Sequence, residues 1–300
     1  MSSVHDVERK TREARKEGLA LRALRPLRSL VVLWACLLVA APQAQESLAD
    51  GARRKSFDQL LDLYVRSGDV YYRALKAERA KLDGYLNLIA TASVDKLSRE
   101  EQIAFWLNAY NAIVLRTIVD HYPIAGKSPD YPSKSIRQIP GAFERLPHRV
   151  AGRTLTLDQL EKDVLPTFND PRVFFALGRG AVGSGRLRSE AFVPARIEEQ
   201  LSDVAAECLS RGQCVQIDAE GGKVGASSIF SWREKEFSAV YADKAPAAIA
   251  NRTPIERAVI AFVYPKLLNA EKDLIAKNTF QVAYKPFDWT LNDLTGRGGR

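Results

Sequence analysis

Phe105-Trp106-Leu107-Asn108-Ala109-Tyr110-Asn111-Ala112 is the centre of the strongest helical pattern in the chain. Ser98 and Glu101 form a capping-box motif at its start, and apolar residues recur at helical spacing almost as far as Pro123. Nearly every face of the segment 104–115 is apolar. We therefore expect a central helix that is buried on most sides, with the rest of the fold packed around it.

Two polar residues interrupt this apolar helix. Asn108 and Asn111 are three positions apart and therefore share a face of the helix. A buried carboxamide without a hydrogen bond costs about 1 to 3 kcal/mol, so both side chains need partners. Either they tie the helix to neighbouring backbone, or they line a pocket.

The composition is typical of a globular protein with a sizeable core, since 46% of the 300 residues are apolar and 27% are charged. The first 44 residues differ from the rest: arginines precede an apolar run at residues 30–41, and Ala44 is a small residue at the expected cleavage point. This order predicts a signal peptide over residues 1–44 and an exported protein of the periplasm or cell envelope. An uncleaved membrane anchor is the alternative, although the apolar run is shorter than the roughly 20 residues that span a bilayer. Membrane contact is expected only through this segment, if it stays uncleaved.

Export also changes the meaning of the net charge. The full chain carries +8, but the leader holds eight Lys or Arg and four Asp or Glu, which leaves +4 on the mature chain. Such a modest charge does not favour nucleic-acid binding, so we expect no nucleic acid partner.

Two cysteines remain after the leader. Cys208 and Cys214 are separated by five residues, and in an exported chain we expect them to form a disulfide. The alternative is that both are buried and reduced. No histidine lies within fifty residues of either cysteine, and we expect neither a metal site nor a cofactor.

Residues 56–295 are expected to form one α+β domain, mostly helical with a small β-sheet, because no internal repeat and no linker divides them. Residues 45–55 are interpreted as a flexible lead-in, and residues 296–300 as a flexible tail. Beyond the central helix, the pattern predicts a hairpin at 148–155, a helix at 157–165, a buried strand at 173–177, a helix at 194–210, a hairpin at 214–225, a helix at 254–268 and a strand at 280–284.

A glycine-rich loop, residues 178–185, follows the predicted buried strand. It contains a GxGxxG pattern, but no helix begins after it until about Pro194, so no dinucleotide site is expected. Guanidinium groups and exposed backbone N–H groups suit carboxylates and phosphates. The loop is therefore either a solvated basic segment or a pocket for a small anionic ligand or an envelope protein. The arginines in or beside it are Arg172, Arg179, Arg186 and Arg188.

Five segments in order resemble the bacterial branch of the family catalogued as domain of unknown function number 547. They are residues 104–114, 155–165, 170–177, 187–192 and 287–292. Glu161 stands at the position of a glutamate in the second segment. The resemblance extends over nearly the whole mature length, and it implies no established reaction.

The sequence departs from this family at the residues most suited to catalysis. Lys162 and Phe174 stand where the family typically has histidines, and Arg179 and Ser184 stand where its loop has cysteines. A thiol nucleophile needs a nearby base or cation. The substitutions therefore predict a catalytically degenerate binding or scaffold protein, a pseudoenzyme of the cell envelope.

The alternative is a hydrolase or acyl-transfer enzyme. In that hypothesis Ser184 is the nucleophile, His148 or His121 is the base, and an asparagine of the central helix helps to hold an oxyanion. Asp288, near the C-terminus, is a further candidate for the same pocket. The candidate binding residues are Arg179, Arg186, Arg188, Asn108, Asn111, Glu161 and Asp288.

Overall fold

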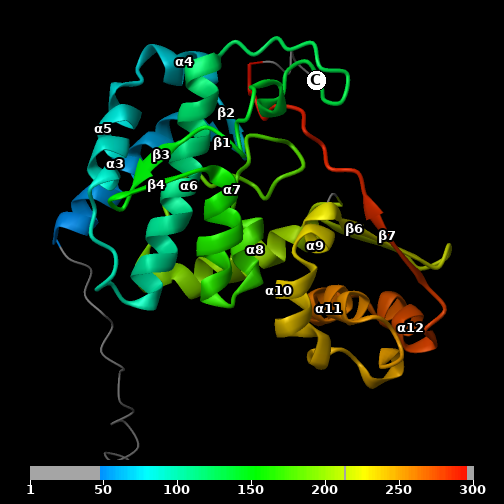
Figure 1. The fold of residues 1–300 in the computed structure, drawn as a ribbon. Helices are drawn as coiled ribbons and strands as arrows, with labels where there is room; N and C mark the ends of the chain where they lie inside the picture. Colours follow the sequence, from blue (N-terminus) through cyan, green and yellow to red (C-terminus); the bar gives the residue numbers. More distant parts are fainter. Residues whose placement is uncertain (1–47, 213, 296–300) are drawn as a thin grey trace, which may run out of the picture. The chain divides into compact units, whose positions relative to one another are not determined.

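The computed structural model describes residues 48–212 and 214–295, which form a mostly helical α+β domain with small β-sheets (Figure 1). This confirms the predicted fold class. The predicted signal peptide, residues 1–44, and the predicted tail, residues 296–300, lie outside the described residues. Within the described part of the chain, no helix is both long and apolar enough to cross a membrane.

The predicted central helix is α6, Arg99–His121. The Ser98 hydroxyl accepts the Glu101 N–H at 3.2 Å, and the Glu101 carboxylate accepts the Ser98 N–H at 2.8 Å, so the capping box is formed. Every residue in the segment 103–115 is buried. The sequence pattern therefore predicted both the start of this helix and its burial correctly.

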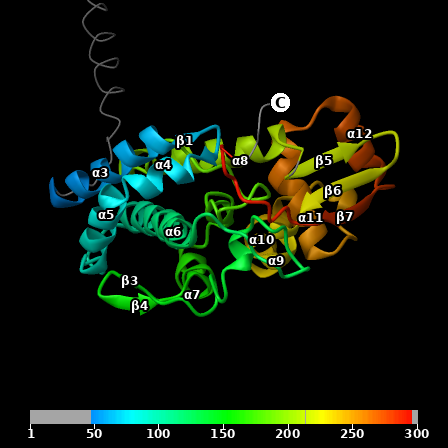
Figure 2. The same cartoon turned by 90° about the horizontal axis from the view of Figure 1, so that it is seen from above.

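Three helices pack on one another and on α6 (Figure 2): α3, Leu48–Tyr64; α4, Tyr72–Ala77; and α5, Ala80–Ala90. Helix α3 begins at Leu48, within the segment 45–55 that we interpreted from the sequence as a flexible lead-in. Phe57 and Leu60 are fully buried and dock the helix. Once those turns are fixed, good helix formers such as Ala52 and Arg53 extend the helix toward its N-terminus at little cost.

The short strands of the helical part form two antiparallel pairs. After α3, β1, Val65–Arg66, pairs with β2, Asp69–Val70. The predicted hairpin at 148–155 is present as β3, His148–Val150, and β4, Arg153–Leu155. It leads into the helical turn α7, Leu157–Gln159.

The predicted buried strand at 173–177 is wrong. Residues Pro171–Phe175 form a 3₁₀ helix, and the Asp170 carboxylate accepts the Arg172 N–H at 3.1 Å as its N-cap. A short apolar run does not by itself distinguish a strand from a buried helical turn. Here the Asp170 cap and a proline at the first position favour the helical conformation.

A three-stranded sheet follows in the order β5-β6-β7 (Figure 2). β5, Val215–Asp218, and β6, Lys223–Ser227, form the predicted antiparallel hairpin, and β7, Gln281–Lys285, pairs with β6 in parallel. The remaining helices are α8, Ile197–Ser210; α9, Ser228–Trp232; α10, Glu234–Tyr241; α11, Pro254–Val263; and α12, Asn269–Lys277.

After β7 the chain runs back toward the helices that pack around α6 (Figure 2). The Leu291 N–H donates to the Lys134 carbonyl at 2.8 Å. This return places Trp289 against Arg137, which lies in the 3₁₀ turn Ile136–Gln138. Residues that are about 150 positions apart in the sequence therefore meet at the site described next.

Candidate functional site

One pocket of about 380 Å³, which we call the charged pocket, is lined by charged and aromatic side chains. Its cationic residues are Arg137, Lys162, Arg179 and Arg233. Its acidic residues are Glu144, Asp158 and Glu161, and its aromatic residues are Phe143, Trp232 and Trp289. The return of the chain after β7 and the turns between α6 and α10 bring these residues together.

Glu161 is the centre of the buried part of this pocket, with 5% of its surface exposed. Arg179 Nε and Nη2 donate to its two oxygens at 3.1 and 2.7 Å, and Arg233 Nη2 donates at 3.0 Å. The Tyr110 hydroxyl, on α6, donates at 2.5 Å. Burial alone would raise the pKa of Glu161, but the Arg179 charge and these hydrogen bonds outweigh it and lower the pKa to about 2. Glu161 is therefore ionised at neutral pH.

The local sequence explains how Glu161 and Arg179 meet. After the capping box of Thr156 and Gln159, residues 160–164 turn as a π-helix, a feature that is frequent at functional sites. Arg179 precedes Gly180, whose φ of +68° favours glycine. A Cβ at Gly180 would collide with the side chain of Ile118, so the glycine lets the loop pack directly on α6.

The glycine-rich loop is buried over much of its length rather than solvated. Residues 173–181 are all buried, and Arg179 is 1% exposed. The Arg179 guanidinium bonds Glu161 and also donates through Nη1 to the Phe174 carbonyl at 3.1 Å. Its charge therefore stabilises the fold and contributes a fixed positive group to the charged pocket.

The structure does not gather the loop arginines into one pocket. Each of the other three faces a carboxylate: Arg172 that of Asp170 at 2.7 Å, Arg186 that of Glu207 at 3.8 Å, and Arg188 that of Glu190 at 2.7 Å. Of the four arginines named from the sequence, Arg179 is the one that lines the charged pocket.

Arg137 is held by two aromatic rings. Its guanidinium carbon lies 4.4 Å from the ring centroid of Phe143 and 4.5 Å from that of Trp289. Nη1 donates to Glu144, while Nε has no hydrogen-bond partner among the described residues. The rings and the carboxylate together restrict the orientation of the guanidinium plane.

Arg233 is a second arginine with unused donors. Its side chain is 10% exposed, and its guanidinium carbon lies 4.5 Å from the ring centroid of Phe174. Nη2 bonds Glu161, but Nε has no partner within the described chain, and Nη1 is 3.8 Å from Glu236 Oε1, beyond hydrogen-bond distance. Glu161 and Phe174 therefore orient the Arg233 guanidinium, while its Nε–H group has no hydrogen-bond partner among the described residues.

An aromatic wall and an ion pair complete the charged pocket. The ring centroids of Trp232 and Trp289 are 6.0 Å apart with planes 21° from parallel, and Phe287 packs against both rings. Trp232 is 45% exposed. Lys162 Nζ donates to Asp158 at 2.5 Å.

The structure does not bring Ser184 together with an imidazole. Ser184 is 7% exposed, and its hydroxyl has no hydrogen-bond partner among the described residues. It lines a small cavity of about 20 Å³, whereas His148 and His121 line a different pocket of about 410 Å³. Burial lowers the pKa of His148 to about 4. The arrangement of nucleophile and base that a serine hydrolase needs is therefore not formed.

The two asparagines of α6 tie the helix to neighbouring backbone. The Asn108 carboxamide exchanges two hydrogen bonds with the main chain of Phe192, at 2.9 and 2.8 Å. The Asn111 carboxamide donates to the Ala176 carbonyl at 3.2 Å and accepts the Gly178 N–H at 2.9 Å. These bonds pair the N–H donors and the carbonyl acceptors of the two carboxamides, which would otherwise be buried without partners.

Asp288 does not line the charged pocket. It is exposed, and its carboxylate accepts the Thr290 N–H at 2.9 Å within its own turn. Its backbone packs against the glycine-rich loop, because Gly183 N donates to the Asp288 carbonyl at 2.8 Å. The neighbouring Trp289, rather than Asp288, reaches the site.

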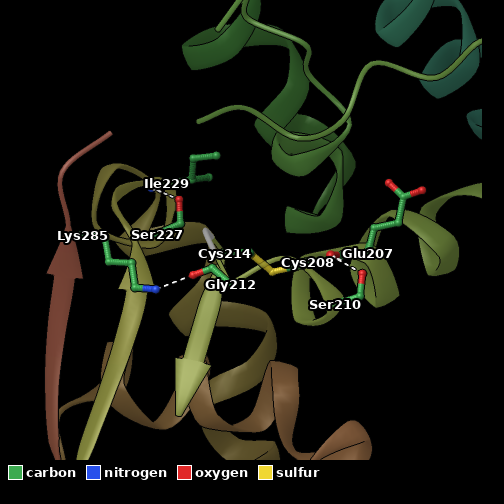
Figure 3. Close-up of a disulfide and its surroundings, with 8 residues drawn as sticks. All are labelled: Glu207, Cys208, Ser210, Gly212, Cys214, Ser227, Ile229 and Lys285. Carbon is green, nitrogen blue, oxygen red and sulfur yellow. Dashed lines mark hydrogen bonds between the residues drawn. A yellow bond between two sulfur atoms is a disulfide. The ribbon is translucent and has the colours of Figure 1, made fainter. Parts of the chain in front are cut away.

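Cys208 and Cys214 form the disulfide that the sequence led us to expect (Figure 3). Both are buried, and their Cα atoms are 4.9 Å apart. The bond joins the end of α8 to the segment before β5, where Lys285 of β7 also donates to the Gly212 carbonyl. Among the described residues, no group of three or more His, Cys, Asp or Glu is placed to hold a metal ion.

Arg137, Trp232 and Arg233 were not predicted as site residues. Arg137 lies in a polar, proline-bearing stretch that has no periodic signal, and Arg233 lies 72 positions from its partner Glu161. The signal available in the sequence was an arginine directly after Trp232, in a stretch that also contains Phe230 and Phe237.

The fold and the site together define a mixed α+β domain with a buried Glu-Arg cluster beside a charged, aromatic pocket. Residues 94–209 match the family model described as protein of unknown function, DUF547, so the chain carries a DUF547 domain there. No curated protein and no solved structure matches the chain. Glu161 and Arg179 lie inside the matched range, whereas Trp232, Arg233 and the family-like segment 287–292 lie beyond it.

Proposed function

We propose that the chain is an exported cell-envelope protein that binds an anionic ligand in the charged pocket and does not hydrolyse it. Arg137 and Arg233 carry the proposal. Both guanidinium groups are oriented by rings and carboxylates, and the Nε–H group of each has no hydrogen-bond partner among the described residues. A buried donor without a partner costs about 1 to 3 kcal/mol. Charge-assisted hydrogen bonds to an anion would be the strongest way to satisfy such donors.

Preorganisation supports binding in this pocket. Arg179 and Arg233 are held by Glu161, and Arg137 is held by Phe143, Trp289 and Glu144, before any ligand arrives. Side chains that are already ordered lose less conformational entropy on binding.

The residue types in the pocket favour binding over the alternative of a hydrolase with a serine nucleophile and a histidine base. The described residues that line it include no serine, cysteine or histidine. Lys162 and Arg179, which stand where the resemblance leads one to expect a histidine and a cysteine, both line it. A lysine that bonds Asp158 and an arginine that bonds Glu161 supply charge, but neither is a nucleophile activated by a base.

The proposal is tested by titrating the mature chain calorimetrically with phosphate, sulfate, acetate, benzoate and D-glucuronate at low ionic strength. We expect saturable binding of at least one anion, and an affinity about tenfold lower in Arg137→Gln, since one charge-assisted hydrogen bond is lost. Arg153→Gln is the matched control, because Arg153 is a 53% exposed arginine on β4 that also faces a carboxylate.

Two results would contradict the proposal. Absence of binding by all five anions, or an equal loss in both variants, would remove the pocket as an anion site. Turnover of an ester or peptide that disappears in Ser184→Ala, with covalent labelling of Ser184 by a serine-directed phosphonate, would replace it with the hydrolase hypothesis.

A further inference from the structure

We infer that the anionic ligand is an acidic sugar, that is, a saccharide ring that carries one carboxylate and several hydroxyl groups. This inference rests on the proposed function and names the ligand class of the charged pocket. Three separate features of the pocket support it: its charge balance, its spare carboxylate oxygens and its exposed tryptophan.

The charge balance favours a ligand with a single negative charge. Four cationic side chains line the pocket and three carboxylates face them, so one positive charge is left over among the lining residues. Glu161 is shared by Arg179 and Arg233, and Glu236, which does not line the pocket, is 3.8 Å from Arg233. Glu236 offsets part of this surplus, so the pocket suits a monoanion such as a carboxylate better than a dianion such as a phosphate monoester.

The remaining two carboxylates favour a ligand that also donates hydrogen bonds. Glu144 receives Arg137 through Oε1, and Asp158 receives Lys162 through Oδ2. A carboxylate has about four acceptor sites, so each can accept further hydrogen bonds. Each of these two carboxylates already faces a cation, so its charge is balanced before a ligand binds. Neutral hydroxyl groups of the ligand can therefore donate to these oxygens, and the ligand needs no ammonium group. Sulfate, acetate and benzoate have no hydroxyl group that could donate to them.

The exposed tryptophan favours a ring. Trp232 keeps 45% of its surface exposed even though Phe287 and Trp289 pack against it. An exposed, rigidly backed indole offers an apolar surface on which the C–H face of a sugar packs while its hydroxyls remain hydrogen-bonded. The pocket, at about 380 Å³, is large enough for a small ligand of this kind.

Calorimetric titration of the mature chain tests the inference with four probes. D-glucuronate has a ring, hydroxyls and a carboxylate; D-glucose lacks the charge; acetate lacks the ring; and benzoate lacks the hydroxyls. We expect D-glucuronate to bind at least about tenfold more tightly than each of the other three, because only it engages all three features.

Variants locate the binding. Trp232→Ala should weaken D-glucuronate about tenfold, and Trp232→Phe, which keeps an aromatic ring, should recover most of the affinity. Tyr71→Ala is the control, since Tyr71 is an aromatic residue of similar exposure, 37%, that does not line this pocket. Circular dichroism and thermal unfolding establish that each variant is folded.

The outcomes separate the two levels of the argument. If acetate or benzoate binds as tightly as D-glucuronate and depends on Arg137, the proposed function stands and the acidic-sugar inference is wrong. If D-glucose binds as tightly as D-glucuronate, the carboxylate has no role and the inference is also wrong. If no anion binds, the proposed function itself fails. Equal affinities in Trp232→Ala and Tyr71→Ala would place the ligand elsewhere.

Discussion

Glu161→Gln is the substitution that most directly probes the buried Glu-Arg cluster. Glutamine has nearly the shape of a protonated glutamic acid, so the variant removes the charge while keeping the volume. The folded pKa of Glu161 is about 2 against an ordinary value of 4.5. Since each pKa unit corresponds to about 1.4 kcal/mol, the carboxylate contributes about 3 kcal/mol to the free energy of unfolding at neutral pH. With 5% of the residue exposed, little of this is screened by solvent.

The sign of the pH dependence follows from the lowered pKa. The stabilisation is fully present above the unfolded pKa and is lost as the pH falls from about 5 through about 2. The wild-type chain should therefore be about 3 kcal/mol more stable than Glu161→Gln at pH 7, and this difference should shrink toward zero near pH 2. Urea unfolding at a series of pH values, with linear extrapolation to water, measures it.

Glu198→Gln is the matched control. Glu198 also bonds an arginine, Arg172, at 2.7 Å, but its side chain is 77% exposed. We expect a loss below about 1 kcal/mol, because solvent screens exposed ion pairs. A loss in Glu161→Gln that is no larger than in this control, or that does not change with pH, would show that the buried charge of Glu161 does not stabilise the fold.

Three further predictions concern the rest of the fold. Asn108→Ala should lower the free energy of unfolding by about 2 to 3 kcal/mol, because it leaves a buried N–H and a buried carbonyl unpaired; chemical denaturation measures this. Gly185→Ala should destabilise the fold by more than about 3 kcal/mol in the same assay, because the new Cβ would collide with the Phe175 carbonyl. Gly84→Ala should instead stabilise it by about 0.5 to 1 kcal/mol, because Gly84 lies on helix α5 and an added Cβ would meet open space. The imidazole of His148 should titrate at about pH 4 in NMR spectra, and a midpoint near its ordinary 6.5 would contradict its burial.

The parts of the fold that the sequence predicted are those specified by local pattern. The Ser98 capping box and the apolar run predicted α6, and both hairpins formed at the segments expected from the sequence, 148–155 and 214–225. The errors occurred where local signals were ambiguous. The apolar run at 173–177 suits a strand as well as a helical turn, and only its proline and N-cap distinguish the two.

The candidate site was predictable only in part. Glu161 and Arg179 were named from the family-like segments and the glycine-rich loop, and both line the charged pocket. Arg233 and Trp289 reach it through contacts between residues far apart in the sequence, which periodicity does not encode. The pairing of Ser184 with His148 failed for the same reason: residue types suggest a chemistry, but the fold decides which of them meet.

A ¹H–¹⁵N NMR spectrum of the arginine Nε–H groups, recorded during titration with D-glucuronate, reports directly on whether the charged pocket binds an anion. The Nε–H signals of Arg137 and Arg233 should shift together and saturate, because both arginines line the charged pocket and both have an Nε without a partner among the described residues. The signal of the exposed Arg153 should stay in place. Shifts confined to Arg153 and other surface arginines, or no shift of Arg137 and Arg233 with any anion of the panel, would contradict the claim that this pocket binds an anion.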